Sequence, residues 1–236
     1  MATVLLVRHG RTTANTSGVL AGRTAGVHLD DVGHRQAAEL GERVAALPVT
    51  AIVSSPLERC RQTAAALARA LGGRVAVKTD KRLVECGYGE WTGRELVALA
   101  KEPLWKVVQN HPSAAQFPGG EALRDMQARA LDAVREYDAT LTADHGPQAL
   151  WIAVSHGDVI KAVLADALGS HLDTFQRIVV DPGSVSVVSY TPLRPFVVRL
   201  NEHGDLSGLA AKPKRGRRRR AASSDAPVGG GAGGAT

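Results

Sequence analysis

The sequence predicts an α/β fold, a three-layer helix/sheet/helix sandwich with a mostly parallel central sheet. Apolar runs at residues 4–7 and 150–154 are typical of strands that are buried on both faces. Segments with helical periodicity alternate with these runs along the chain, and such alternation builds a parallel sheet between two layers of helices. Both apolar runs end at a histidine and a glycine, His9-Gly10 and His156-Gly157, which places polar groups at one edge of the sheet.

The first part of the chain should supply three strands and two helices. Asp30 is expected to cap the first helix, and Pro56 to open the second, because the missing N–H of proline does no harm in a first turn. The expected elements are a strand at 3–8, a loop at 11–28, a helix at 30–47, a strand at 50–55, a helix at 56–71 and a strand at 74–79.

The second part should contain a cap, two helices and three strands. Residues 93–119 contain three prolines and cannot form one continuous helix, so we expect a short cap over the strand ends. Asp158 is expected to cap the helix that follows His156, and Gly169 to end it. The remaining elements are a helix at 121–142, a strand at 150–155 and a closing pair of strands at 184–191 and 196–201.

Composition indicates a globular protein of the cytoplasm. The chain is 44% hydrophobic and 22% charged, and no apolar run approaches the roughly 20 residues that a membrane span needs. The first apolar run meets Arg8 too early for a signal peptide. Cys60 and Cys86 match no zinc or redox spacing, which fits buried thiols in a reducing compartment.

The basic charge is confined to the C-terminal end. The net charge is +6, yet residues 1–210 carry 22 basic and 22 acidic side chains, and the excess lies in the run at 212–220. The remainder of 211–236 is rich in glycine and lacks large apolar groups, so we expect a domain at 1–210 followed by a disordered tail. The tail either serves solubility alone or makes weak electrostatic contact with nucleic acid or acidic lipid.

Cationic side chains gather at the predicted C-terminal edge of the sheet. Arg8 and His9 follow the first strand, Arg59 lies just past the second, and His156 follows the fourth. Two guanidiniums and two imidazoles facing one crevice form a site for a dianion, because arginine can donate paired hydrogen bonds to phosphate oxygens. Helix N-termini after Pro56 and Gly157 favour anions as well.

Five segments in order resemble the motif set of the histidine phosphatase superfamily, which includes cofactor-dependent phosphoglycerate mutases and related broad phosphatases. The similarity covers about residues 3–190 and leaves out the basic tail, and it implies a phosphoglycerate mutase-like fold. The segments are LVRHGRTTAN, SSPLERCRQTA, RLVECGYGEWTG, GGEAL and VSHGDVIKAVL. One departure is Asp30, where a threonine is common, and both residues cap helices well.

The resemblance implies a metal-independent phosphatase without a cofactor. It makes His9 the nucleophile that forms a phosphohistidine and Glu85 the general acid. The residues that it implies to hold the phosphoryl group are Arg8, Arg59 and His156, with Thr12, Asn15 and Gly157 lining the phosphate pocket. The substrate would be a small phosphorylated metabolite.

The sequence is also compatible with three functions other than phosphatase activity, each of which it favours less. A phosphoglycerate mutase would use the same site but needs a larger basic cap, whereas residues 93–119 offer mainly Arg94, Lys101, Lys106 and His111. A nucleic-acid-binding protein would use the basic tail, although the body of the chain is neutral. A metal hydrolase would use His9, His156, Asp158 and Glu85, but two arginines would crowd a divalent cation.

Substrate and oligomeric state are less well determined by the sequence. Apolar residues of the cap predict contact with a group larger than phosphate. They are Leu96, Leu104, Trp105 and Phe117. A homodimer through a sheet edge or the cap is compatible with the sequence, which carries no direct signal for assembly.

Overall fold

The computed structural model describes residues 2–210 and contains a six-stranded mixed sheet in the order β3-β2-β4-β1-β5-β6. The first four strands along the chain pair in parallel, and β5 and β6 are joined to them as antiparallel strands, so the predicted mostly parallel sheet is confirmed. The strands are β1 (Thr3–Arg8), β2 (Val49–Ser54), β3 (Val77–Thr79), β4 (Leu150–Ser155), β5 (Val185–Tyr190) and β6 (Pro195–Glu202).

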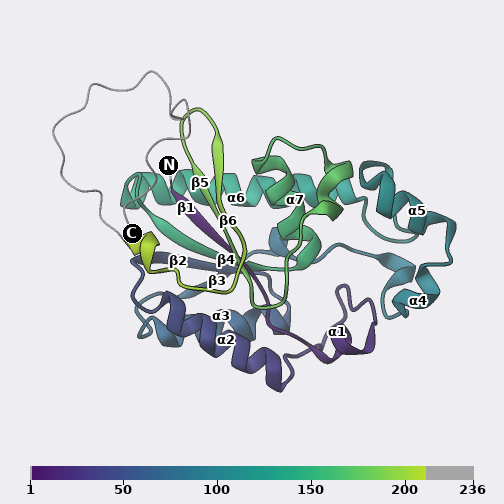
Figure 1. Cartoon of the computed structure of the whole chain (residues 1–236), viewed down its shortest axis with the longest axis horizontal. Coiled ribbons are helices and arrows are strands. Elements are labelled where there is room, and N and C mark those ends of the chain that lie inside the picture. The colour runs from purple at the N-terminus through teal and green to yellow at the C-terminus, as the bar shows by residue number, and fades with distance from the viewer. Residues whose placement is uncertain (1, 211–236) are drawn as a thin grey trace.

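Two pairs of long helices cover the two faces of the sheet, as Figure 1 shows. On one face lie α2 (Asp31–Val44) and α3 (Glu58–Ala70), and on the other lie α6 (Leu123–His145) and α7 (Gly157–Ala167). The three-layer architecture predicted from the sequence is therefore confirmed.

The alternation of side chains along β1 explains why both faces of the sheet need a helix layer. Val4 and Leu6 belong to the hydrophobic cluster that includes α6 and α7. Leu5 and Val7 belong to the cluster that includes α2 and α3. All four side chains are at most 2% exposed, because successive residues of a strand point to opposite faces. The continuous apolar run is thus the sequence signature of a strand buried on both sides.

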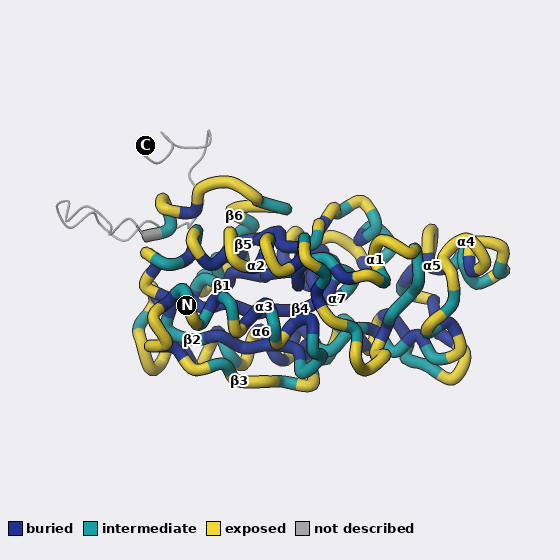
Figure 2. Tube along the Cα trace, turned by 90° about the horizontal axis from the view of Figure 1, so that it is seen from below, coloured by how far each residue is buried: buried dark blue, intermediate teal, exposed yellow. Residues whose placement is uncertain are grey.

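The segment expected to form a cap lies beyond the strand ends as an irregular chain with short helices (Figure 1). It contains α4 (Leu96–Leu99), α5 (Pro103–Asn110) and a 3-10 turn at Pro112–Ala114. Figure 2 shows mostly buried residues around the sheet and many exposed residues at α4 and α5. The loop expected at 11–28 also contains a short helix, α1 (Thr13–Ser17). Reciprocal hydrogen bonds between Thr12 and Asn15 cap its N-terminus.

Several predicted boundaries are wrong for identifiable reasons. Asp30 caps α2 as predicted, but α3 begins at Glu58 with Leu57 as its N-cap, so Pro56 lies outside the helix. The strand β3 is shorter than expected: its backbone pairs with β2 only from Val77 to Thr79.

Asp158 does not cap α7. The N-cap residue is His156, which makes no side-chain cap, and Asp158 lies inside the first turn of the helix. The helix expected at 121–142 spans 123–145 instead. The backbone of Glu121 bonds to Gly87 and Phe117, and Ala122 is the extended N-cap.

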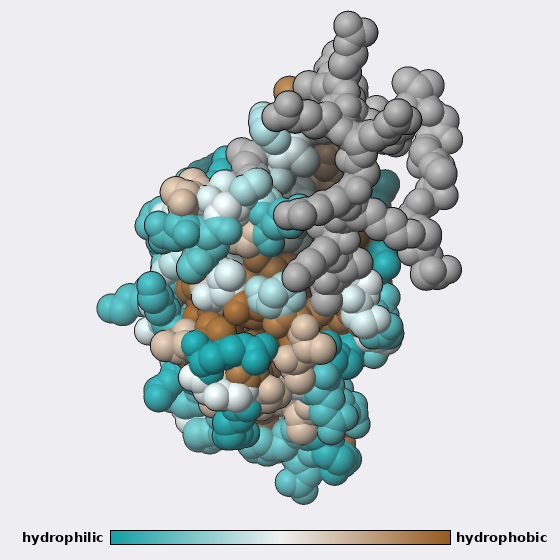
Figure 3. Space-filling view, turned by 90° about the vertical axis from the view of Figure 1, so that its left-hand side faces the viewer, coloured by the Kyte–Doolittle hydropathy of each residue, from teal (hydrophilic) through white to brown (hydrophobic). Residues whose placement is uncertain are grey.

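Figure 3 views the molecule from the end where β1 begins. Hydrophilic side chains form most of this face, and hydrophobic side chains are visible near its centre. Between residues 2 and 210, no helix combines the length and hydropathy of a membrane span. The prediction for the tail at 211–236 concerns residues outside those described.

Candidate active site

His9 lies immediately after β1 and is 4% exposed. Its Nδ1 is 2.7 Å from the carbonyl oxygen of Gly10, which can only accept, so Nδ1 carries the proton. A Cβ at Gly10 would lie 2.5 Å from the carbonyl oxygen of Gly33, which explains the glycine after the histidine. Burial, followed by the charges of Arg59 and Arg8, holds the pKa of His9 well below its usual value. The ring is therefore neutral, with its lone pair on Nε2.

Arg59 lies in the first turn of α3, as predicted, and is 2% exposed. Its Nε donates to Nε2 of His9 at 3.3 Å, and its Nη2 donates to the carbonyl of Gly22 at 2.7 Å. Its Nη1 is buried and has no hydrogen-bond partner within the described chain. A buried guanidinium nitrogen without an acceptor is costly, so this geometry favours an incoming anion.

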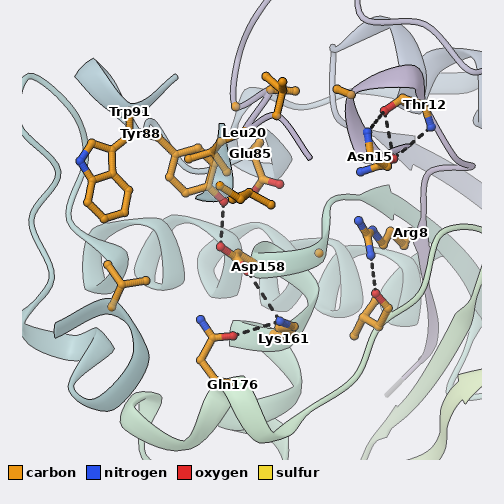
Figure 4. A pocket seen from close by; sticks show the side chains of 18 of the residues that line it. Arg8, Thr12, Asn15, Leu20, Glu85, Tyr88, Trp91, Asp158, Lys161 and Gln176 are labelled. Carbon is orange, nitrogen blue, oxygen red and sulfur yellow. Dashed lines mark hydrogen bonds and ion pairs between the residues drawn. The ribbon is translucent and has the colours of Figure 1, made fainter. Parts of the chain in front are cut away.

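Arg8 ends β1 beside His9. Its Nη1 donates to the carbonyl of Val180 at 2.6 Å, a contact that orients the guanidinium (Figure 4). Its Nε is a second buried nitrogen that finds no partner among residues 2–210. Gly157, the first residue of α7, lies alongside: a Cβ there would be 3.6 Å from Cζ of Arg8.

Thr12 and Asn15 line the same cavity from the turn that begins α1. The side-chain Oδ1 of Asn15 accepts from the backbone N–H of Thr12 at 3.0 Å and from its hydroxyl at 2.9 Å (Figure 4). Because these bonds occupy Oδ1, the amide NH2 of Asn15 is the group that remains to donate to a ligand.

Glu85 provides a carboxyl group in this cavity. It is partly exposed, and its Oε1 accepts from the backbone N–H of Cys86 at 2.9 Å. Together, the loss of solvent around the carboxyl, which is the largest cause, and the negative charge of Asp158 raise the pKa of Glu85 to about 7, against the hydrogen bond from Cys86 and the charges of Arg59 and Arg8. A carboxyl with this pKa can give and take a proton near neutral pH.

The loop that carries Glu85 is held by two arginines. Arg129 of α6 donates to the carbonyls of residues 82, 84 and 85, at 2.6, 2.7 and 3.2 Å. Arg23 donates to the carbonyl of Glu85 at 2.8 Å, and both arginines pair with Glu121. Glu121 also accepts from the N–H of Gly87. These bonds fix the backbone on which the Glu85 side chain depends.

His156 is fully buried behind His9, with the two ring centroids 5.3 Å apart. Its Nδ1 accepts from Nη2 of Arg59 at 3.2 Å, so its proton lies on Nε2, which is 2.7 Å from Oγ of Ser55. Cys60 lies 3.4 Å from the same nitrogen, and burial raises the pKa of this thiol to about 12. His156 thus contacts Arg59 and Ser55, and its predicted contact with phosphate stays a prediction.

One cavity of about 510 Å³ brings most of the predicted residues together. Of those predicted, its lining includes Arg8, His9, Thr12, Asn15, Arg59, Glu85 and Gly157. His156 lies behind this wall instead of in it. Figure 4 shows Arg8, Thr12 and Asn15 at one end of the cavity and Trp91 at the other, with Glu85 and Asp158 between them.

The sequence pattern missed the contacts that surround these residues. Tyr88 donates its hydroxyl to Asp158 at 2.7 Å, which explains why Asp158 faces the cavity instead of capping α7. Lys161, one turn further along α7, lies 3.9 Å from Asp158 and contacts Gln176. The spacing of Asp158 and Lys161 is the signal that could have placed both on one helix face.

The residues described do not form a cluster that suits a metal ion. Across residues 2–210, no group of three or more histidine, cysteine, aspartate or glutamate side chains is arranged to hold one. The candidate cavity instead places Arg8 and Arg59 beside His9, and positive charge there opposes a divalent cation.

The chain belongs to the histidine phosphatase superfamily (branch 1), whose sequence profile it matches over residues 4–203. It is 32% identical over 192 residues to a probable phosphoglycerate mutase GpmB from Erwinia tasmaniensis, a match that covers 80% of this chain and 86% of the relative.

Solved structures show the same fold. The chain resembles Bacillus stearothermophilus YhfR with a TM-score of 0.76 and 26% identity, over 89% of this chain and 100% of the other. It resembles mycobacterial glucosyl-3-phosphoglycerate phosphatase with a TM-score of 0.74 and 25% identity, over 84% and 98% of the two chains.

Proposed function

We propose that this chain is a metal-independent phosphomonoester hydrolase that acts on a small phosphorylated metabolite through a phosphohistidine. The observation that carries the proposal is the cavity in which a neutral imidazole, the buried guanidinium of Arg59, the half-buried guanidinium of Arg8 and a carboxyl of pKa about 7 lie together. Membership of the histidine phosphatase superfamily supports it.

The first step is the transfer of the phosphoryl group to His9. Nε2 of His9 attacks phosphorus, the N–P bond forms, and the bond from phosphorus to the leaving oxygen breaks. Substrate phosphate takes the place of the His9–Arg59 contact, and Arg8 and Arg59 donate to its oxygens. Such donors stabilise the charge on the transferring group and position it for in-line attack.

Glu85 supplies and recovers the proton. In the first step the protonated carboxyl gives its proton to the departing alkoxide. In the second step the carboxylate takes a proton from water while that water attacks phosphorus, the N–P bond breaks, and inorganic phosphate leaves. The neutral His9 and the protonated Glu85 are then restored.

His156 is proposed to position Arg59, which it contacts through Nδ1. Thr12, Asn15 and Gly157 are proposed to line the phosphate end of the cavity, where they lie beside Arg8. A ring turn that brings the Nε2 proton of His156 to phosphate would make it a direct donor, as the family resemblance implies.

Hydrolysis is favoured over mutase activity by the charges of the cap. Arg94 pairs with Glu102 at 2.6 Å, and none of the basic residues between 93 and 119 is among the described residues that line the cavity. A mutase needs cations for the second anionic group of its substrate. The mutase alternative is supported by the name of the Erwinia relative.

Product analysis separates the two activities. Purified protein is given a panel of phosphomonoesters, and 3-phosphoglycerate with and without a bisphosphate primer. A hydrolase releases inorganic phosphate from monoesters, and His9→Ala abolishes this release. Primer-dependent isomerisation of phosphoglycerate without net phosphate release would establish the mutase instead.

The domain boundary, location and tail belong to the same proposal. We place the catalytic domain at 1–210, with 93–119 as its cap, in the cytoplasm, which suits two buried free cysteines. Removal of 211–236 is expected to leave kcat and KM unchanged. A loss of nucleic-acid binding on this truncation would support weak electrostatic contact by the tail, and a loss of activity would contradict the assigned domain.

A further inference from the structure

The cavity has an apolar end that the proposed chemistry does not use. Opposite the phosphate residues, aromatic and aliphatic side chains from the loop after α1, from the loop before α4 and from the cap form its wall. These residues are Leu20, Trp91, Leu96, Trp105, Val108 and Phe117. Figure 4 shows Trp91 far from Arg8, with Leu20 and Tyr88 lying between them.

The aromatic rings at this end are fixed against one another. Trp91 and Trp105 stack with their ring centroids 6.1 Å apart and an angle of 26° between the rings. Trp91 also meets Phe117 edge to face at 5.2 Å. Trp91 and Phe117 are buried, whereas Trp105 on α5 keeps part of its surface exposed. The wall is therefore preformed, and Trp105 offers ring surface that a ligand can cover.

The charges near this end disfavour a second anion. Beyond Arg8 and Arg59, the charged side chains of the described lining are those of Glu85, Asp158, Asp181 and Lys161. Lys161 is the single cation among these four, and it is already engaged. Its Nζ donates to Oε1 of Gln176 at 3.1 Å and lies 5.8 Å from the ring centroid of Phe175. Asp181 follows Val180, whose carbonyl accepts from Arg8, and its charge acts on Arg8, so it belongs to the phosphate end. A carboxylate further along the substrate would thus meet Asp158 and an occupied lysine.

We propose that the preferred substrates are monophosphate esters of uncharged alcohols that carry an aromatic or similarly large apolar group. This inference rests on the phosphatase function proposed above. The phosphate occupies the end with Arg8 and Arg59, and the apolar group contacts Trp105 and Leu96. Esters with a second anionic group, such as phosphoglycerate, are poor substrates because the described residues at the far end give that group no free cation.

A matched pair of esters tests the preference without changing the reacting alcohol. 3-Phenylpropyl phosphate and 3-phosphooxypropanoate both release a primary alkoxide, so they differ mainly at the distal group. With the full chain, we expect kcat/KM to be at least about tenfold higher for the phenyl ester, which corresponds to about 1.4 kcal/mol of discrimination. Equal values, or faster hydrolysis of the anionic ester, would overturn the inference while leaving the phosphatase function intact.

Variants of the cavity wall locate the source of the preference. Trp105→Ala should lower kcat/KM for the phenyl ester about tenfold, mainly through KM, and leave the anionic ester nearly unchanged. Val97→Ala is the matched control, because Val97 is 74% exposed and lies outside the described lining. An equal loss for both esters in Trp105→Ala would contradict the assigned contact.

A cation introduced at the rim keeps the test decisive if Trp105→Ala does not fold. Leu96 lines the cavity and is 38% exposed, so Leu96→Arg is expected to fold. The added cation should raise kcat/KM for the anionic ester and lower the preference for the phenyl ester. No change in either value would contradict the inference. Failure to hydrolyse any phosphomonoester would instead overturn the proposed function, and this inference with it.

Discussion

Replacement of Asp158 by asparagine is expected to lower the pKa of Glu85 and to shift the loss of activity at alkaline pH toward lower pH. Glu85 acts as the acid only while protonated, so kcat/KM for an alkyl phosphate should fall as the pH rises through about 7. Asp158 contributes a negative charge that favours the protonated form of Glu85. Its removal therefore favours the carboxylate.

The raised pKa sets the scale of the effect. A carboxyl of pKa about 7 is half protonated at pH 7, whereas at the ordinary value of 4.5 only about 0.3% would be protonated. The site therefore holds roughly 150 times more of the acid form at neutral pH than an ordinary glutamate would. Burial is the largest cause and Asp158 the second, so the loss in Asp158→Asn at pH 7 is bounded by this factor.

The assay is kcat/KM for an alkyl phosphate between pH 4 and 9. Asp158→Asn should show its alkaline decline at lower pH, and Glu85→Gln should lack this decline and lose about 10²–10⁴ in rate. Asp181→Asn is the control, since Asp181 also lines the cavity and bonds to Asn201. A decline at the same pH in Asp158→Asn and wild type would refute the electrostatic argument. Its persistence in Glu85→Gln would exclude Glu85 as the acid.

Three further variants test other parts of the site. Arg59→Met should cost about 10²–10³ in kcat, because it removes a donor to the transferring phosphoryl group, and a retained urea midpoint would exclude unfolding as the cause. Arg129→Met should lower kcat for alkyl phosphates, because Arg129 holds the loop that carries Glu85, but should spare 4-nitrophenyl phosphate, whose leaving group needs no acid. Arg124→Met on the same helix is the control. Equal losses for both substrates in Arg129→Met would contradict a positioning role. Glu85→Gln should raise Tm relative to wild type at pH 8 but not at pH 4. Because folding raises the pKa of Glu85, the contribution of this residue to stability is present below about pH 4.5 and is lost as the pH rises through about 7. A Tm difference that does not change with pH would contradict this last prediction.

The sequence predicted the anion end of the site because that end depends on strand termini. Arg8, His9 and Arg59 follow parallel strands, and the carboxyl ends of parallel strands meet at one edge of the sheet. Local pattern is enough to predict such a meeting. His156 was brought to the same edge, but the direction of its ring depends on packing against Ser55 and Arg59, which no local pattern specifies.

The acid end was harder to predict because it depends on contacts between distant segments. Glu85 lies on an irregular loop whose position is set by Arg129 from α6 and Arg23 from the loop before α2. Asp158 has the residue type and position of a helix cap, yet it accepts a hydrogen bond from Tyr88, which is 70 residues away. Tertiary hydrogen bonds of this kind override the local preference for capping.

Rapid-quench labelling with a substrate carrying ³²P at the phosphoryl group tests whether His9 is phosphorylated during turnover. We expect a transient, acid-labile and alkali-stable label on the peptide that contains His9, formed before phosphate is released and absent in His9→Ala. Label on another residue, or phosphate release by His9→Ala at the wild-type rate, would contradict this expectation.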